Sequence, residues 1–276
     1  MRKNDSLELK IVRVMLPLLI YYGVSLIVQV IFGIYAQIRI FLNMENSVDY
    51  SKAYHFIENT ERYISEHSLA VTFVAAVITI GILWIIFRKD NRKPVNQAHH
   101  LLPVILMGVF ASSGLSKLVT LLRIDNIIGS YESVNQNFMD NPMIFQILTL
   151  CVAAPFVEEL VFRGIMYQRM KDYMDKVTAV LLSSLIFGVY HGNLVQGLYA
   201  GILGVLFCFV YEKCGSFAAP VLFHMAANTT ALIMMYFPVS TFISEHIILK
   251  IFVMLLELIG LCIITYFLYQ KTGGEE

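Results

Sequence analysis

The chain has 276 residues, of which 58% are hydrophobic and 14% are charged, and its mean hydropathy is +0.69. This composition excludes an ordinary soluble domain and predicts an all-α polytopic membrane protein, a bundle of transmembrane helices. The formal net charge is zero, so nothing in the charge favours nucleic acid as a partner. Cys151, Cys208, Cys214 and Cys262 follow no metal-ligand or disulfide spacing, and we interpret them as packing residues.

We expect about eight apolar segments to cross the bilayer as helices. The first is expected to be retained, because it is long and lacks the small-residue site at which signal peptides are cleaved. The expected spans are residues 14–36, 69–87, 101–122, 143 to beyond 159, 177–190, 194–211, 217–237 and 247–269.

Basic residues mark the connections that we expect in the cytoplasm. The densest basic cluster, at 88–93, follows the second span, and others lie at 2–13 and 169–176. Eight spans with these connections inside place both termini in the cytoplasm. Residues 37–68 are polar and net acidic. Apolar residues recur there at intervals of three and four within 53–64, which favours a helix at the membrane interface, with a solvated loop as the alternative.

No internal repeat or disordered linker divides the chain, so we expect one domain. Residues 1–142 hold the first three spans and their loops, residues 143–237 hold the helices that carry the candidate chemistry, and residues 238–276 hold the last span and the tail.

Two adjacent acids interrupt the fourth span, in the stretch Pro155-Phe-Val-Glu-Glu-Leu-Val-Phe-Arg-Gly164. Ionisable residues are costly inside a bilayer, and they are functional candidates there. Because residues four apart share one helix face, Glu159 can pair with Arg163, whereas Glu158 has no partner in its own helix. A buried charge needs a partner, so we expect one for Glu158 on another helix.

Two histidines on later helices match the depth of Glu158. From the helix rise, Glu158, His191 and His224 lie roughly 20, 22 and 16 Å from the basic residue at the cytoplasmic end of their helices. Phe187 precedes His191 by four residues, and Asn228 follows His224 by four. A carboxylate beside a neutral imidazole can take a proton from water, which is general-base chemistry. A second histidine with an amide can stabilise a developing oxyanion.

Three short motifs therefore follow one another in the C-terminal half of the chain. They are Glu158-Glu159-x-x-x-Arg163, Phe187-x-x-x-His191 and His224-x-x-x-Asn228. Their types, order and spacing resemble the CPBP family, the CAAX prenyl endopeptidase and bacteriocin-processing (Abi) family of intramembrane proteases. The resemblance covers about residues 143–232, and the first three spans match only in being hydrophobic.

The resemblance implies a different role for each group of motif residues. The implied roles are water activation by Glu158 and His191, bracing by Glu159 with Arg163, and stabilisation of the tetrahedral intermediate by His224 with Asn228. We expect Phe187 and Phe162 to line the substrate site. Taken alone, the pair of Glu159 and Arg163 would be a structural ion pair more often than a catalytic one.

A metal is the alternative to water activation by side chains alone. Family members are often named metalloproteases, and Glu158, His191 and His224 would form a zinc site with an open fourth position. No His-Glu-x-x-His helix is present, and with three ligands committed Glu159 would have to act as the base. We favour a metal-free site, with zinc as the alternative.

The leading hypothesis is an intramembrane endopeptidase of a bacterial cell membrane, with its cavity reached from the cytoplasmic half. Its substrate would be a membrane-associated or lipidated peptide or protein, and the sequence does not decide whether it is prenylated. Two other classes stay open: a proton-coupled transporter that uses the buried acids and histidines as a relay, and a membrane protein that binds a peptide without cleaving it, as in bacteriocin immunity. The absence of repeats counts against the transporter.

Overall fold

The computed structural model describes residues 6–43, 50–89, 101–122, 138–192, 194–237, 242–243 and 245–272. Most of the predicted connections, including the larger part of the basic cluster at 88–93, lie outside the described residues. Within the described part of the chain the main elements are eight helices, and the predicted all-α bundle is confirmed. Their bounds are α1 Leu7–Leu42, α2 Tyr50–Lys89, α3 Leu101–Leu121, a composite helix Met143–Met170 that contains α6 to α8, α9 Lys176–Tyr190, α10 Leu194–Cys214, α11 Ala218–Tyr236 and α13 Ile247–Thr272.

Seven of these helices are long and apolar enough to cross a membrane. The exception is α9, whose 15 residues span roughly 22 Å, less than the roughly 30 Å of a hydrocarbon core. Helices α9 and α10 form a hairpin, and a Cβ added at Gly188 would lie 2.5 Å from the Gly197 carbonyl oxygen, so the two backbones nearly touch. The base of the hairpin is held by Glu212, whose carboxylate pairs with Lys171 and Lys176.

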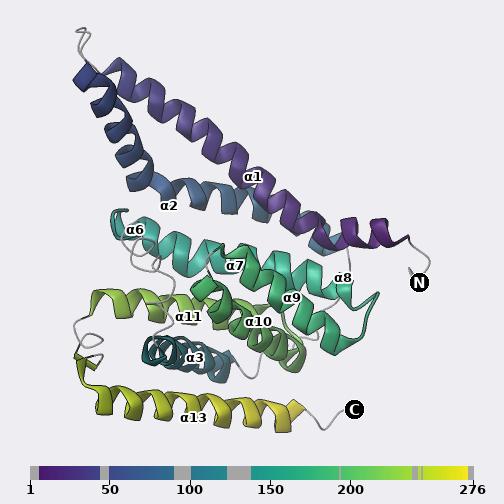
Figure 1. Cartoon of the computed structure of the whole chain (residues 1–276). Coiled ribbons are helices and arrows are strands. Elements are labelled where there is room, and N and C mark those ends of the chain that lie inside the picture. Colours follow the sequence, from purple (N-terminus) through teal and green to yellow (C-terminus); the bar gives the residue numbers. More distant parts are fainter. Residues whose placement is uncertain are drawn as a thin grey trace.

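The helices stand side by side in the order shown in Figure 1, with the hairpin of α1 and α2 at one edge and α13 at the other. Helix α1 begins and α13 ends at the same end of the bundle. That end is rich in basic residues, and we call it the basic end. The described residues that define it are Lys10, Arg13, Arg88, Lys89, Arg169, Lys171, Lys176 and Lys213.

Residues 50–68 belong to α2, which continues as one helix from Tyr50 to Lys89. The extension is held against α1 by Tyr63, whose hydroxyl accepts a hydrogen bond from Arg39 Nη1 at 2.6 Å and whose ring stacks on Phe32. The solvated-loop alternative is therefore wrong, and the helix expected at the interface is an extension of a span.

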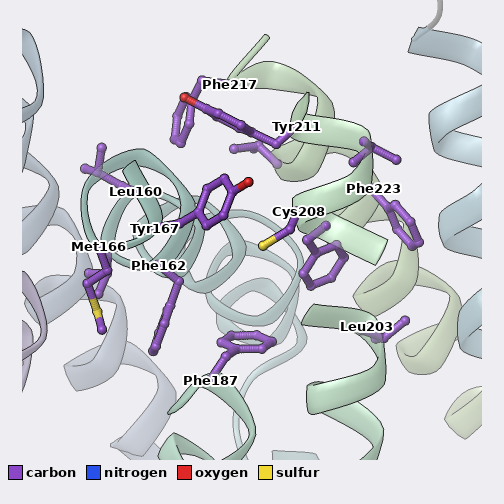
Figure 2. Packing of buried hydrophobic residues seen from close by; sticks show 14 of the residues in the cluster. Leu160, Phe162, Met166, Tyr167, Phe187, Leu203, Cys208, Tyr211, Phe217 and Phe223 are labelled. Atoms are coloured by element: carbon purple, nitrogen blue, oxygen red, sulfur yellow. The ribbon is translucent and has the colours of Figure 1, made fainter. Parts of the chain in front are cut away.

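An aromatic core surrounds the composite helix. Figure 2 shows Phe162, Tyr167 and Phe187 packed among residues of α10 and α11. Their side chains are at most 1% exposed. Three of the four cysteines are buried in the bundle, while Cys262 is exposed on α13, and all four are free. This packing fixes the composite helix against its neighbours and so fixes the position of the two acids.

Candidate active site

The helix that carries the acids is wound unevenly. Two stretches with wide π-helical turns, η2 (Gln146–Ala153) and η3 (Leu160–Tyr167), flank the short α-helical segment α7 (Ala154–Glu159). Wide turns of this kind are frequent at functional sites. They were not predicted from the sequence, because ordinary helical spacing was assumed throughout.

The wide turn before the acids leaves one backbone carbonyl without an N–H donor from its own helix, and a side chain donates to it instead. The N–H of Ala154 bonds to the oxygen of Thr149, five residues back. The next donor in this pattern would be that of residue 155, but proline has no N–H. The carbonyl of Leu150 instead accepts a hydrogen bond from Asn228 Nδ2 at 2.8 Å. Asn228 thereby ties α11 to the helix of the acids.

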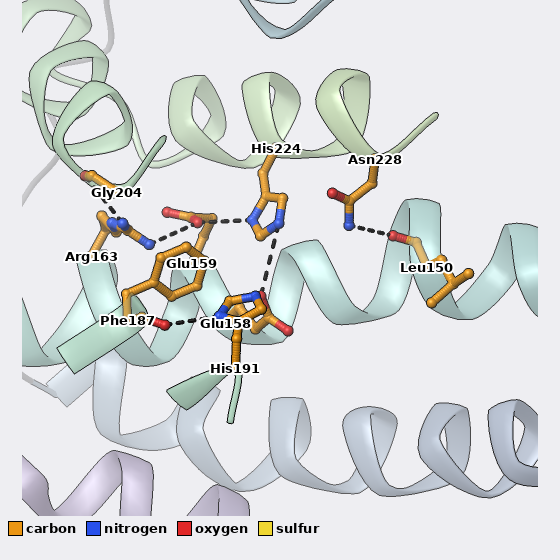
Figure 3. Close-up of polar contacts among 9 residues, drawn as sticks. All are labelled: Leu150, Glu158, Glu159, Arg163, Phe187, His191, Gly204, His224 and Asn228. Carbon is orange, nitrogen blue, oxygen red and sulfur yellow. Dashed lines mark hydrogen bonds and ion pairs between the residues drawn. The ribbon is translucent and has the colours of Figure 1, made fainter. Parts of the chain in front are cut away.

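Glu159 is fully buried and is held by two neighbours. Its Oε1 accepts from Arg163 Nη1 and lies 3.0 Å from it, so the predicted ion pair is present. The same oxygen lies 3.0 Å from His224 Nδ1 (Figure 3). Because a carboxylate accepts, His224 must carry its proton on Nδ1, which leaves Nε2 turned towards the cavity.

Arg163 is fully buried, as is its partner Glu159. Its Nη2 donates to the Gly204 carbonyl at 3.1 Å, and its guanidinium carbon lies 4.4 Å from the centroid of the Phe187 ring and 4.9 Å from that of Phe207. Ring faces attract a cation, so the aromatic walls partly replace water around this charge. A Cβ at Gly204 would come within 3.0 Å of Arg163 Nη2, which explains the small residue there.

Glu158 points into the cavity, and its residue is 8% exposed. Its Oε2 lies 3.8 Å from His224 Nε2. His224 therefore stands between the two acids, one at each ring nitrogen, and its ring is stacked on Phe207. The partner expected for Glu158 on another helix is present.

His191 faces Glu158 from the end of α9 (Figure 3). It is the C-cap residue of α9, and its Nδ1 lies 2.8 Å from the Phe187 carbonyl oxygen. A carbonyl can only accept, so Nδ1 carries the proton and Nε2 is left as the free acceptor. The Phe187 ring meets the His191 ring edge-on, with centroids 4.9 Å apart, and holds its orientation.

A cavity of about 480 Å³ joins these groups. Of the eight predicted site residues, five line it: Glu158, Phe187, His191, His224 and Asn228. The other three, Glu159, Phe162 and Arg163, are fully buried and do not line it. Phe162 packs against Phe187 and Tyr190 instead, so it supports the wall without forming part of it.

The cavity extends from Glu158 away from the basic end. On the composite helix it is lined by Ala154 and Leu150, which precede Glu158, and on α11 by residues up to Met235, which follow His224. The cavity was expected to be reached from the cytoplasmic half, marked by basic residues, whereas its lining residues extend towards the end opposite the basic end. The depth of the polar groups was readable from the sequence, but the open side depends on where each neighbouring helix ends.

The formal charges of the site nearly cancel. Two carboxylates and one guanidinium sum to −1, so one proton shared among Glu158, His191 and His224 makes the buried cluster neutral. Burial strongly favours neutrality. The arrangement can therefore hold one transferable proton beside the cavity.

The structure adds residues that no motif had indicated. Ser112, Ser116 and Thr120 of α3 line the cavity, although the first three spans showed no site pattern. Tyr190 meets His191 with ring centroids 5.4 Å apart, and Tyr21 of α1 meets Tyr190 at 5.8 Å. The regular four-residue spacing of the three hydroxyls is the signal for them in the sequence.

The proposed zinc ligands have suitable outer partners. The Nδ1 atoms of both histidines are bonded to a carboxylate or a carbonyl, as is usual for zinc-bound histidines. Among the described residues, however, no three His, Cys, Asp or Glu side chains converge closely enough to hold a metal ion. The chemistry of the donors fits zinc, while their present spacing does not.

Together these features define a helical membrane protein with a buried acid and histidine site at the end of an internal cavity. Residues 140–230 match the family described as Type II CAAX prenyl endopeptidase Rce1-like. This match supports the resemblance to the CPBP family over these residues, which include all three motifs.

A curated relative supports the same assignment. The chain is 29% identical over 100 residues to the Bacillus subtilis (strain 168) protein named "Putative membrane peptidase YdiL". The match covers 36% of this chain and 41% of the relative, so the chain spans less than half of the relative it matches. No solved structure matches the chain.

Proposed function

We propose that the protein is an intramembrane endopeptidase that hydrolyses a peptide bond of a membrane-associated peptide or protein. The observation that carries this proposal is the placement of Glu158, a carboxylate lining the cavity with His224 Nε2 3.8 Å from it. The Rce1-like domain and the peptidase-named relative support it. We further propose that the membrane is that of a bacterial cell and that the basic end is cytoplasmic, by the positive-inside rule.

In this proposal Glu158, assisted by His191, removes a proton from a water molecule as that water attacks the carbonyl carbon of the substrate. A new bond forms between the water oxygen and this carbon, and the carbonyl oxygen becomes an oxyanion. The proton held by the carboxyl group then passes to the amide nitrogen as the carbon–nitrogen bond breaks. The products are a carboxylic acid and an amine, which exchange a proton to become a carboxylate and an ammonium group, and the site returns to its starting charge.

The other groups prepare the site for this step. His224 and the second N–H of the Asn228 amide lie beside the cavity, where they can stabilise the oxyanion. Glu159 fixes the orientation and tautomer of His224, and Arg163 compensates the charge of Glu159. If zinc is bound instead, Glu158, His191 and His224 would hold it, and it would polarise the carbonyl and the water.

The direct test is turnover of a lipid-anchored fluorogenic peptide by purified protein in liposomes. Glu158→Gln keeps the shape of the side chain but removes the base, and we expect at least about a hundredfold loss of rate. Glu66→Gln, at a half-buried acid of α2 that pairs with Arg62 and lies outside the cavity, is the matched control and should retain wild-type turnover. Undiminished turnover in folded Glu158→Gln protein would remove Glu158 from the mechanism.

A further inference from the structure

The cavity opens progressively towards the end of the bundle opposite the basic end. Along α3, Ser112 is buried, Ser116 is half-buried and Thr120 is exposed. Along α11, His224 is buried and Ala231 is exposed. Both helices run from the basic end to the opposite end, since α11 follows α10, which ends there, and α3 lies antiparallel to α13, which also ends there. Exposure thus rises along α3, while on α11 Ala231 is exposed and the next lining residue, Leu232, is buried.

The short hairpin of α9 and α10 explains the opening. Its tip lies at His191, the C-cap residue of α9, whose side chain faces Glu158 (Figure 3). The composite helix begins fifteen residues before Glu158, at Met143, and α11 continues twelve residues beyond His224, to Tyr236. Past the tip, the cavity is therefore walled mainly by α3, η2 and α11.

The wall formed by α3 differs in chemistry from the walls facing it. Ser112, Ser116 and Thr120 recur every four residues, which places one hydroxyl every 6 Å or so along the helix. An extended peptide presents equivalent backbone groups every two residues, or about 6.6–6.8 Å. The opposing walls contribute apolar groups, among them Leu150 and Ala154. The spacing suits a strand that hydrogen-bonds to α3 and packs its side chains on the other walls.

We propose that this cavity is a groove for an extended peptide segment that reaches Glu158 from the end opposite the basic end and lies along Ser112, Ser116 and Thr120. The proposal rests on the proposed function, because the segment is the substrate of the same site. Eleven helical residues from His224 to Met235 cover roughly 16 Å, which accommodates about five extended residues. If the basic end is cytoplasmic, the substrate is a peptide presented on the non-cytoplasmic side.

Sidedness is tested without any catalytic step, by thiol labelling in a Cys262→Ala background in sealed vesicles. The three remaining cysteines are buried. Ser116→Cys should react with a charged, membrane-impermeant thiol reagent only from one side. Lys89→Cys, at the exposed end of α2, should react only from the other side and defines the basic end. Labelling of both cysteines from the same side, or of Ser116→Cys from neither side, would overturn the proposal.

The hydroxyls are tested by steady-state kinetics with the lipid-anchored peptide. Ser112→Ala, Ser116→Ala and Thr120→Val should each raise KM by roughly fivefold, as expected for one hydrogen bond, with kcat nearly unchanged. Thr230→Val is the matched control, because its hydroxyl donates to the carbonyl four residues back, as that of Thr120 does, but the residue does not line the cavity. Wild-type KM in the triple variant would show that α3 does not bind the peptide.

The two experiments distinguish failure of the proposed function from failure of the proposed direction of access. If the protein cleaves nothing but Ser116→Cys labels from the opposite side, the proposed function fails and the direction of access stands. If cleavage depends on Glu158 but Ser116→Cys labels from the basic end, the proposed function stands and the direction of access is refuted.

Discussion

Glu158 and Glu159 are adjacent in the chain, yet their surroundings assign them opposite roles. Glu159 is fully buried, with Arg163 and His224 on one oxygen, whereas Glu158 faces the cavity. A carboxylate that is fully enclosed and held by two fixed donors is a poor base, and one beside a cavity and an imidazole is well placed to accept a proton. The single imidazole of His224 connects them, so a change at Glu159 must be felt at Glu158.

This connection predicts the behaviour of Glu159 variants. Glu159→Gln should lower the free energy of unfolding by about 3–5 kcal/mol, because it leaves the Arg163 charge buried and unpaired. The double variant Glu159→Leu/Arg163→Met removes both charges and should regain most of that stability. It should stay inactive, since His224 has lost the acceptor that orients it. Thermal unfolding and peptide turnover check the two parts, and full activity in the double variant would contradict the orienting role.

Metal dependence is decided by a separate measurement. We expect protein washed with a strong chelator to retain its turnover and to contain far less than one metal ion per chain, because the site can activate water through Glu158 and His191 alone. The control is a chelator-washed sample to which zinc is returned. Loss of turnover on washing, with recovery on zinc addition, would instead assign Glu158, His191 and His224 as zinc ligands.

At the scale of the helix, the composite helix depends on a residue far along the chain. Pro155 leaves the Leu150 carbonyl without a helical donor, and Asn228 of α11 supplies one. Asn228→Ala should therefore lower the free energy of unfolding by about 1–3 kcal/mol, the cost of an unsatisfied buried acceptor. In a Pro155→Ala background the new N–H can take over, so the same change should cost clearly less. Equal costs in both backgrounds, measured by thermal unfolding, would refute this compensation.

The hairpin of α9 and α10 depends on the absence of side chains at its crossing. A Cβ at Gly188 would lie 2.5 Å from the Gly197 carbonyl oxygen, so Gly188→Val must push the helices apart. Since His191 lies three residues further on, we expect turnover to fall sharply, with a stability loss of about 1–3 kcal/mol. Gly81→Ala in α2 is the control, because nothing lies within 4 Å of its added Cβ. Wild-type turnover in Gly188→Val would mean that hairpin packing does not position His191.

The spacing of residues within one helix made much of this site predictable. The features that were not predicted depend on contacts between residues far apart in the chain. The pairing of Glu159 with Arg163 follows from a four-residue interval within one helix. The wide turn of η2 depends on Asn228, 78 residues after Leu150, and only Pro155 hinted at it. The extension of α2 likewise depends on Arg39 of α1, which reaches Tyr63. Such compensation becomes visible only when the partner helices are placed.

At the scale of the whole molecule, a second buried ion pair joins the last helix to the bundle. Lys117 Nζ of α3 lies 3.0 Å from Glu257 Oε2 of α13, and Ser113 Oγ donates to the same carboxylate at 2.6 Å. Small residues bring the helices together nearby, since a Cβ at Gly260 would lie 2.8 Å from the Phe110 ring. These contacts fix α13 antiparallel to α3, so α13 returns the chain to the basic end.

The hairpin and this return of α13 together determine the side on which the chain ends. Helix α9 starts at the basic end and α10 returns to it, so the pair crosses the membrane either twice or not at all. In both cases the start of α1 and the end of α13 lie on the same side. Reporter domains fused before residue 1 and after residue 276 should therefore report the same compartment. A reporter fused after residue 246, before α13, should report the opposite one. Termini in different compartments would mean that one of the six long helices outside the hairpin does not cross the membrane.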